Sequence, residues 1–121
     1  MMVIRFIFFL VFFSFFSKSY SQTNSNNYQV LLQGFWWDYY NSNYNNRYSD
    51  YLVDLAPRLR AIGIDAIWIP PSIKNTQIVD MGYAPFDHYD LGDKYQKGFL
   101  KTKLGDKDQL LRMVAVMKAN G

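Results

Sequence analysis

The chain has 121 residues, a formal net charge of +3 and no cysteine; half of its residues are hydrophobic and 19% are aromatic. This composition excludes a disordered acidic tail, a disulfide-stapled mini-protein and a thiolate metal site. Without residues 1–21, which include Arg5 and Lys18, the net charge falls to +1. The charge therefore gives no reason to expect nucleic acid or an anionic membrane as a partner.

The N-terminus carries the pattern of an export signal. Arg5 gives a positive start, and Phe6–Phe16 is an apolar run of 11 residues. A membrane-spanning helix needs about 20 apolar residues, so this run is too short for an anchor. The pattern predicts a signal peptide over residues 1–21, cleaved after Ser21, and a secreted or periplasmic protein with no membrane association after cleavage. Residues 22–27 are expected to form a flexible mature N-terminus.

Residues 28–121 begin with two strand patterns separated by a loop and a helix pattern. Val30–Leu32 and Ile64–Ile69 are apolar runs that predict strands buried on both faces. Residues 36–47 are rich in aromatic residues and asparagine without helical periodicity, which predicts a loop.

Between these strands, apolar residues at helical spacing predict a helix over about residues 49–62. Ser49 or Asp50 can cap its start. Pro57 is expected to kink or break the helix, and Gly63 is expected to end it.

A loop of about 35 residues is then expected to run from the Pro70-Pro71 pair to Gly105, and loops of that length are usually functional. A last helix follows, with Asp106 and Gln109 spaced as a capping box. Its predicted apolar stripe comprises Leu110, Leu111, Val114 and Met117. The order strand, helix, strand, loop, helix predicts an α/β fold with a parallel sheet covered by helices. Two strands do not make such a sheet stable alone, so the fold is expected to be incomplete.

The long loop contains the residue types that bind sugars. Met81–Tyr95 holds four aromatic residues, three Asp and the single His. Aromatic faces stack on pyranose rings, while Asp, Asn, Gln and His meet hydroxyl groups. A second aromatic cluster follows the first strand, and both clusters would emerge at the carboxyl ends of parallel strands, where sites form. The second cluster comprises Trp36, Trp37, Tyr39 and Tyr40. From composition alone, burial of these rings as core residues remains the alternative.

Two further patterns in this loop point away from a ligand. Asp87, Asp90 and Asp93 do not have the spacing of a calcium loop. The lysines from Lys94 to Lys107 alternate with Asp and predict a solvated face.

Several segments resemble those of one family, the α-amylases of glycoside hydrolase family thirteen. Gly63–Pro71 (GIDAIWIPP) resembles its second barrel strand, and Asp80–Gly92 (DMGYAPFDHYDLG) resembles the segment that follows that strand. Leu32–Phe35 (LQGF), with Trp37, resembles the first strand and its exit. The similarity covers about residues 29–121 with the motifs in family order, and it is closest to the bacterial liquefying-type α-amylases.

The resemblance implies that residues 28–121 form about two βα units, from strand 1 to helix 2, of a TIM (β/α)8 barrel. By motif match, Tyr83 would stack on the sugar at the cleavage subsite, and Gln33 would line the cleft. Trp37 and His88 are further substrate-binding candidates.

Asp87 and Asp90 also match the family motif. We expect these two carboxylates to hold the loop through hydrogen bonds rather than to touch sugar.

The catalytic carboxyl pair of the family is not matched in this sequence. Retaining glycosidases need two carboxyl groups about 5–5.5 Å apart. The proton donor of the family is a Glu, whereas all ten acidic residues here are Asp. No catalytic residue and no metal ligand is therefore assigned in this chain.

We accordingly expect an N-terminal fragment, itself inactive, of a secreted α-amylase-type glycoside hydrolase. The complete enzyme would hydrolyse α-1,4-glucosidic bonds of starch or glycogen with retention. The resemblance implies calcium and a monomeric state for that complete enzyme. A secreted, non-catalytic α-glucan-binding module and a truncated gene product without separate function are the alternatives.

Overall fold

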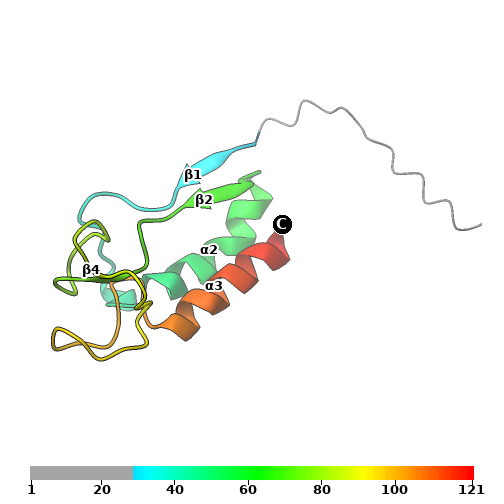
Figure 1. The fold of residues 1–121 in the computed structure, drawn as a ribbon. Helices are drawn as coiled ribbons and strands as arrows, with labels where there is room; N and C mark the ends of the chain where they lie inside the picture. The colour runs from blue at the N-terminus through cyan, green and yellow to red at the C-terminus, as the bar shows by residue number, and fades with distance from the viewer. Residues whose placement is uncertain (1–28) are drawn as a thin grey trace, which may run out of the picture.

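The computed structural model describes residues 29–121 (Figure 1). The predicted signal peptide and the predicted flexible segment 22–27 lie outside the described residues. The elements are β1 (Leu31–Gln33), the 3-10 helix η2 (Ser42–Tyr44), α2 (Tyr48–Ala61), β2 (Ala66–Trp68), β3 (Lys74–Asn75), β4 (Pro85–Asp87) and α3 (Lys107–Asn120). The predicted α/β order of strand, helix, strand, long loop and helix is confirmed, and residues 29–121 form no closed barrel. No helix among these residues is long and apolar enough to cross a membrane.

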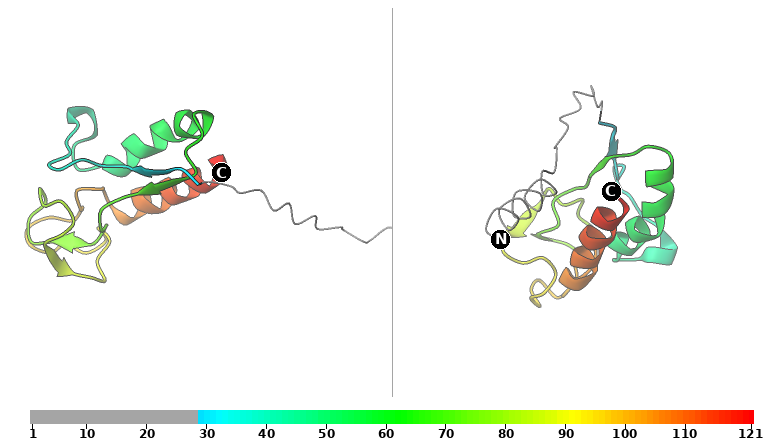
Figure 2. Two further views of the ribbon diagram at one scale, coloured as in Figure 1. Left: turned by 90° about the horizontal axis from the view of Figure 1, so that it is seen from above. Right: turned by 90° about the vertical axis from the view of Figure 1, so that its right-hand side faces the viewer.

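The strands β1 and β2 pair in parallel, with Leu32 opposite Ile67. Both helices lie on the same side of this two-stranded sheet and pack against each other (Figures 1 and 2). The prediction that both strands are buried on both faces is wrong for the described residues, because Leu31 is 62% exposed and Trp68 is 50% exposed. The physical reason is that helices cover only one face of this small sheet, and within residues 29–121 no second layer covers the other.

The first amides of α2 donate hydrogen bonds to backbone carbonyls of a distant turn rather than to a capping side chain. The amides of Tyr48 and Ser49 donate to the carbonyls of Lys103 and Leu104, at 3.5 and 2.8 Å. The residue that precedes the helix makes no side-chain capping hydrogen bond. The prediction that Ser49 or Asp50 caps this helix is therefore wrong, because a distant turn of the chain supplies the acceptors.

The other end of α2 confirms the predicted stop at Gly63. Gly63 has a φ of 87°, and its amide donates to Arg60 O, while the amide of Ile64 donates to Leu59 O, both at 3.0 Å. This is the Schellman arrangement, which needs a left-handed residue after the helix. The helix runs through Pro57 without a break. Because packing of the buried face supplies most helical stability in proteins, one missing hydrogen bond at an exposed position does not end the helix.

The predicted capping box of α3 is confirmed. Asp106 Oδ1 accepts from the amide of Gln109 at 2.9 Å, and Gln109 Oε1 accepts from the amide of Asp106 at 3.0 Å. The long segment before α3 is not structureless, since β3 and β4 pair antiparallel within it.

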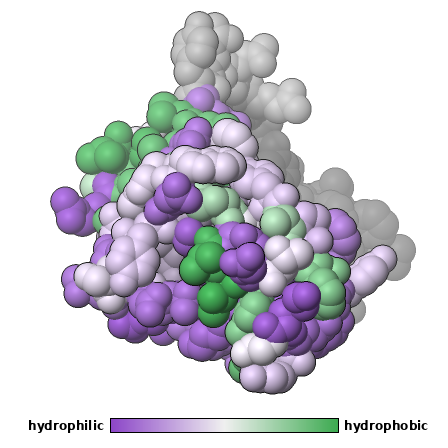
Figure 3. Space-filling model, turned by 90° about the vertical axis from the view of Figure 1, so that its left-hand side faces the viewer, coloured by the Kyte–Doolittle hydropathy of each residue, from purple (hydrophilic) through white to green (hydrophobic). Residues whose placement is uncertain are grey.

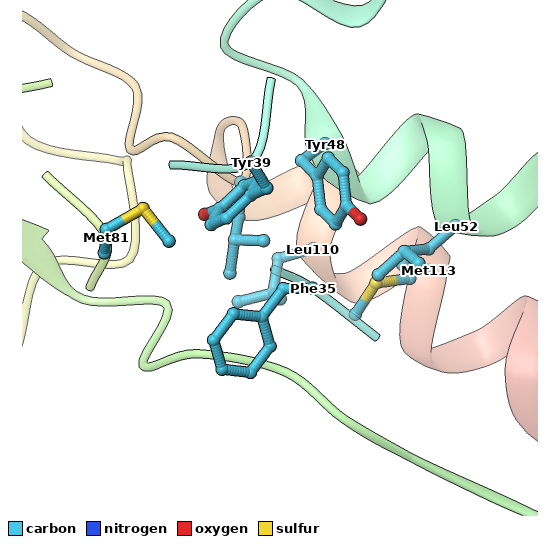
Figure 4. Close-up of a cluster of buried hydrophobic side chains, with 8 residues drawn as sticks. Phe35, Tyr39, Tyr48, Leu52, Met81, Leu110 and Met113 are labelled. Atoms are coloured by element: carbon cyan, nitrogen blue, oxygen red, sulfur yellow. The ribbon is translucent and has the colours of Figure 1, made fainter. Parts of the chain in front are cut away.

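The hydrophobic core lies between the helices and the loops that follow the strands (Figure 4). From α3 it receives Leu110 and Met113, which are buried. The predicted stripe is wrong at Leu111 and Val114, which are exposed, because the buried face of α3 carries Leu110 and Met113, with Met117 packed against the core. The core comprises Phe35, Tyr39, Tyr48, Leu52, Met81, Leu104, Leu110 and Met113.

Candidate functional site

An open pocket of about 570 Å³ is formed by the segment after β1, the segment after β2 and the turn before α3. These loops gather at the end of the molecule that Figure 3 faces, where several hydrophobic areas lie among polar side chains. Loops at the carboxyl ends of parallel strands are the usual place for binding sites in α/β folds. The pocket is lined by Trp37, Asp38, Val79, Asp80, Met81, Tyr83, Ala84 and Lys103.

Two of the predicted sugar-binding residues, Tyr83 and Trp37, line this same pocket. The Tyr83 side chain is 49% exposed, and Trp37 is 70% exposed. The Tyr83 ring lies 6.4 Å from the ring of buried Phe35, which itself packs edge-on against Trp68 at 5.5 Å. Tyr83 is thus backed by the core residue Phe35, while half of its surface is open to a ligand.

The other two predicted substrate-binding residues are not brought into this pocket. Gln33 ends β1 and is exposed, and its Nε2 donates to the carbonyl of Phe35 at 3.1 Å. His88 follows β4 and is exposed at the surface. The structure therefore brings two of the four predicted residues together.

The second predicted aromatic cluster divides between surface and core. Trp36, Trp37 and Tyr40 are exposed, but Tyr39 is only 1% exposed and contacts Tyr48, with ring centroids 4.4 Å apart. Burial is the main reason that the pKa of Tyr39 is raised well above its usual value. The expectation that Tyr39 belongs to a ligand-facing cluster is wrong, because its ring fills the core beneath the pocket.

Lys103 adds a positive charge to the lining of the pocket, and the sequence pattern did not single out this residue. Lys103 Nζ donates to the carbonyl of Val79 at 3.0 Å and lies 4.4 Å from the ring centroid of Tyr39. The expectation that the lysines before α3 form a solvated face is therefore wrong at Lys103. Alternation with Asp holds for the neighbouring lysines, but it carries no information about a contact that spans 24 residues.

Asp87 and Asp90 hold the loop through hydrogen bonds, as predicted. Asp90 Oδ1 accepts from the amides of Gly92, Asp93 and Lys94, at 2.8, 3.1 and 3.3 Å. Asp87 accepts from the amide of Tyr89 at 2.8 Å and from Gln96 Nε2 at 2.8 Å. Neither carboxylate lines the pocket.

Asp90 also pairs with a lysine that sequence reasoning missed. Lys74 Nζ lies 3.2 Å from Asp90 Oδ2, and both side chains are fully buried. The ammonium also lies 4.8 Å from the ring centroid of Phe99. No local pattern marks Lys74, because all of its partners come from the far end of the loop. Its remaining hydrogen bonds go to the carbonyls of Lys94, Phe99 and Leu100.

These contacts shift the pKa of both carboxyl groups. Hydrogen bonds from Gln96 and from the Tyr89 amide lower the pKa of Asp87 to about 2. Burial alone would raise the pKa of Asp90, but the hydrogen bonds that it accepts outweigh burial and lower it. A carboxyl group whose folded-state pKa is depressed stabilises the fold above its ordinary pKa, and this contribution is lost as pH falls.

Acidification is therefore expected to loosen the loop before the core. The melting temperature should be constant from neutral pH down to about 5 and should fall between about pH 4 and 2, as the carboxylates become protonated. A thermal melt across this pH range measures the effect, and Asp87→Asn should make the acid fall shallower. A melting temperature that does not change between pH 5 and 2 would contradict this assignment.

A second cavity, of about 210 Å³, lies between β2 and the two helices. Its lining is largely apolar and includes Leu52, Ile67 and Met117. It offers few polar groups to orient a polyol, so we assign the candidate sugar site to the Tyr83–Trp37 pocket.

The pocket combines two open aromatic rings with the side chains of Asp38, Asp80 and Lys103, which can stack on a ligand and form hydrogen bonds with it. Residues 29–121 contain no group of three or more Asp or His side chains placed to hold a metal ion. The described residues thus offer no carboxylate cluster for the calcium that the family resemblance implies.

Comparison with known proteins finds relatives that are 37–44% identical to parts of this chain. The chain is 40% identical over 92 residues to glucan 1,4-α-maltohexaosidase of Bacillus sp. strain 707, a match that covers 76% of this chain and 17% of that protein. It is 44% identical over 66 residues to α-amylase of Geobacillus stearothermophilus, covering 54% of this chain and 12% of that protein. It is 37% identical over 92 residues to cytoplasmic α-amylase of Escherichia coli K12, covering 75% and 18%. No protein-family model matches the chain.

These relatives define a class, since all are glycoside hydrolases named for α-amylase or maltohexaosidase activity. The chain belongs to the α-amylase family. Its matches span less than a fifth of the length of these relatives.

Proposed function

We propose that this chain supplies an aromatic wall of the substrate cleft in a glycoside hydrolase that cleaves α-1,4-glucosidic bonds of starch or glycogen with retention. The observation that carries the proposal is the joint exposure of Tyr83 and Trp37 in one pocket, on the loops that follow two parallel strands. Open aromatic faces beside Asp38 and Asp80 suit a sugar ring, which has an apolar face and a rim of hydroxyl groups.

In this proposal the 121 residues bind sugar but do not cleave it. Retaining hydrolysis needs a carboxyl pair about 5–5.5 Å apart, with a proton donor that is a Glu in this family, and the sequence has no Glu. The parallel pair β1 and β2 joined by α2 is a βαβ unit, which supports a place for these elements in a (β/α)8 barrel. The leader pattern of residues 1–21 supports export. From the resemblance, we propose that the complete enzyme is a monomer. We also propose that it uses calcium, held by other residues.

A non-catalytic, secreted α-glucan-binding module is the second candidate. It is favoured by the same exposed pocket together with the absence of Glu from the sequence. Binding of maltooligosaccharides without release of reducing ends is common to both candidates for this chain. A longer polypeptide that contains this sequence and hydrolyses starch distinguishes the first candidate.

Titration of the protein with maltoheptaose tests the proposal. Tyr83→Ala should weaken binding about tenfold or more, because a stacked aromatic side chain buries apolar surface worth about 1.5–3 kcal/mol. The matched control is Tyr89→Ala, since Tyr89 is 87% exposed and does not line the pocket. Equal effects of the two substitutions would contradict the site, and starch cleavage by the 121-residue protein would contradict its assignment to binding alone.

A further inference from the structure

Among residues 29–121, Lys103 is the lysine that lines the Tyr83–Trp37 pocket, and its ammonium makes three contacts. They are directed to the carbonyl of Val79 at 3.0 Å, to Met81 Sδ at 3.4 Å and over the ring of Tyr39, whose centroid is 4.4 Å away. Two of these contacts are hydrogen bonds, and the third is a cation–π contact. These contacts tie the Lys103 side chain to three groups at the pocket.

The Lys103 side chain connects the segments that line the pocket. Met81 Sδ also accepts from the amide of Asp38 at 3.0 Å, so the sulfur connects the segment that carries Trp37 to the segment that carries Tyr83. The backbone of Lys103 is fixed in turn by the bridge between Thr102 and Gly105, with hydrogen bonds of 2.8 and 3.1 Å. A shift of the ammonium would thus be transmitted to both open aromatic rings.

The electrostatic environment of Lys103 differs from that of the neighbouring lysines. Burial lowers the pKa of Lys103, and the nearby carboxylates of Asp38 and Asp80 only partly oppose the shift. Its charged form is accordingly less favourable in the fold than in water. Within residues 29–121 Lys103 makes no ion pair, whereas Lys101 and Lys107 do. A lysine whose pKa is lowered by burial, beside two exposed aromatic rings in a pocket, is a candidate functional residue.

We infer that Lys103 is a positioning residue of the glucan pocket, which sets the separation of Trp37 and Tyr83 through its contacts to Val79, Met81 and Tyr39. The inference rests on the proposed function, because it assumes that a glucan ring occupies this pocket. It assigns Lys103 to substrate affinity rather than to stability or to bond cleavage.

Lys103→Met separates these roles, because methionine keeps the length of the side chain and removes the charge. The affinity for maltoheptaose should fall about tenfold, while the melting temperature stays the same or rises. Lys118→Met, on an exposed lysine of α3, is the control and should change neither quantity. An unchanged affinity would overturn the inference, and so would a loss of affinity accompanied by a lower melting temperature.

Chemical rescue gives a second readout that a purely structural role would not move. Because the sequence has no cysteine, Lys103→Cys introduces a single thiol. Alkylation with 2-bromoethylamine restores an ammonium at the length of lysine, whereas 1-bromopropane gives a neutral group of the same size. The aminoethylated protein should recover affinity to within about threefold of the original, and the propylated protein should not.

Equal affinities of the two alkylated forms would overturn the inference. An original protein that does not bind maltoheptaose at all would contradict the proposed function, and the inference with it. Binding by the original protein together with no effect at Lys103 would contradict the inference alone.

Discussion

Lys74→Met is expected to lower the free energy of unfolding by about 3–5 kcal/mol, because it leaves the carboxylate of Asp90 buried without its partner. Both side chains are 0% exposed, and Lys74 Nζ lies 3.2 Å from Asp90 Oδ2. The substitution also removes the donor from three carbonyls on the far side of the loop. These carbonyls belong to Lys94, Phe99 and Leu100.

Chemical denaturation measures this effect against an exposed pair on the same loop. Lys94 Nζ lies 3.3 Å from Asp87 Oδ2, but its side chain is 47% exposed. Lys94→Met should therefore cost no more than about 1 kcal/mol. Adding Asp90→Asn to Lys74→Met should restore part of the loss, since it removes the unpaired charge. Equal costs for Lys74→Met and Lys94→Met would show that the buried pair does not organise the loop.

Gly82→Ala is the second substitution with a large expected effect, because it acts on the site and on stability together. Gly82 lies between Met81 and Tyr83 with a φ of +100°, and a Cβ there would come within 2.6 Å of the carbonyl oxygen of Pro71. The left-handed conformation alone costs a side chain about 1–2 kcal/mol. The clash with backbone then requires Pro71 or Tyr83 to move, so maltoheptaose binding should fall as well.

Gly63→Ala is the matched control for this prediction. Gly63 has a φ of +87°, and a Cβ there would meet nothing within 4 Å. It should therefore cost only the conformational term of about 1–2 kcal/mol and leave sugar binding unchanged. Denaturation and titration of both variants measure the difference. If Gly82→Ala costs no more than Gly63→Ala and still binds, the close approach of Gly82 to Pro71 is not important.

Features that depend on neighbouring residues could be predicted from the sequence. The capping box of Asp106 and Gln109 involves residues three apart, and Gly63 ends α2 through contacts within five residues. The role of Asp87 and Asp90 in holding the loop was likewise predictable, because the backbone amides that donate to their carboxylates lie within four residues.

Features that depend on distant contacts could not be predicted in this way. The carbonyl of Leu104 caps α2 from 55 residues away, so neither Ser49 nor Asp50 was needed as a cap. Lys74 and Lys103 look like ordinary surface lysines until folding brings their partners to them. In the candidate site, the exposure of Tyr83 and Trp37 agrees with the aromatic pattern, whereas their common pocket depends on the path of the whole loop.

The buried ammonium of Lys74 has a consequence for the environment in which this loop can keep its shape. Oxygen atoms surround it much as they would surround a bound metal ion, but this cation is covalently attached to the chain. It cannot be extracted by EDTA or diluted away, and its occupancy does not vary with the salt of the medium. The loop segment from Asp90 to Leu100, which this ammonium holds, should therefore remain ordered in chelating solutions that remove ions from metal-bound loops.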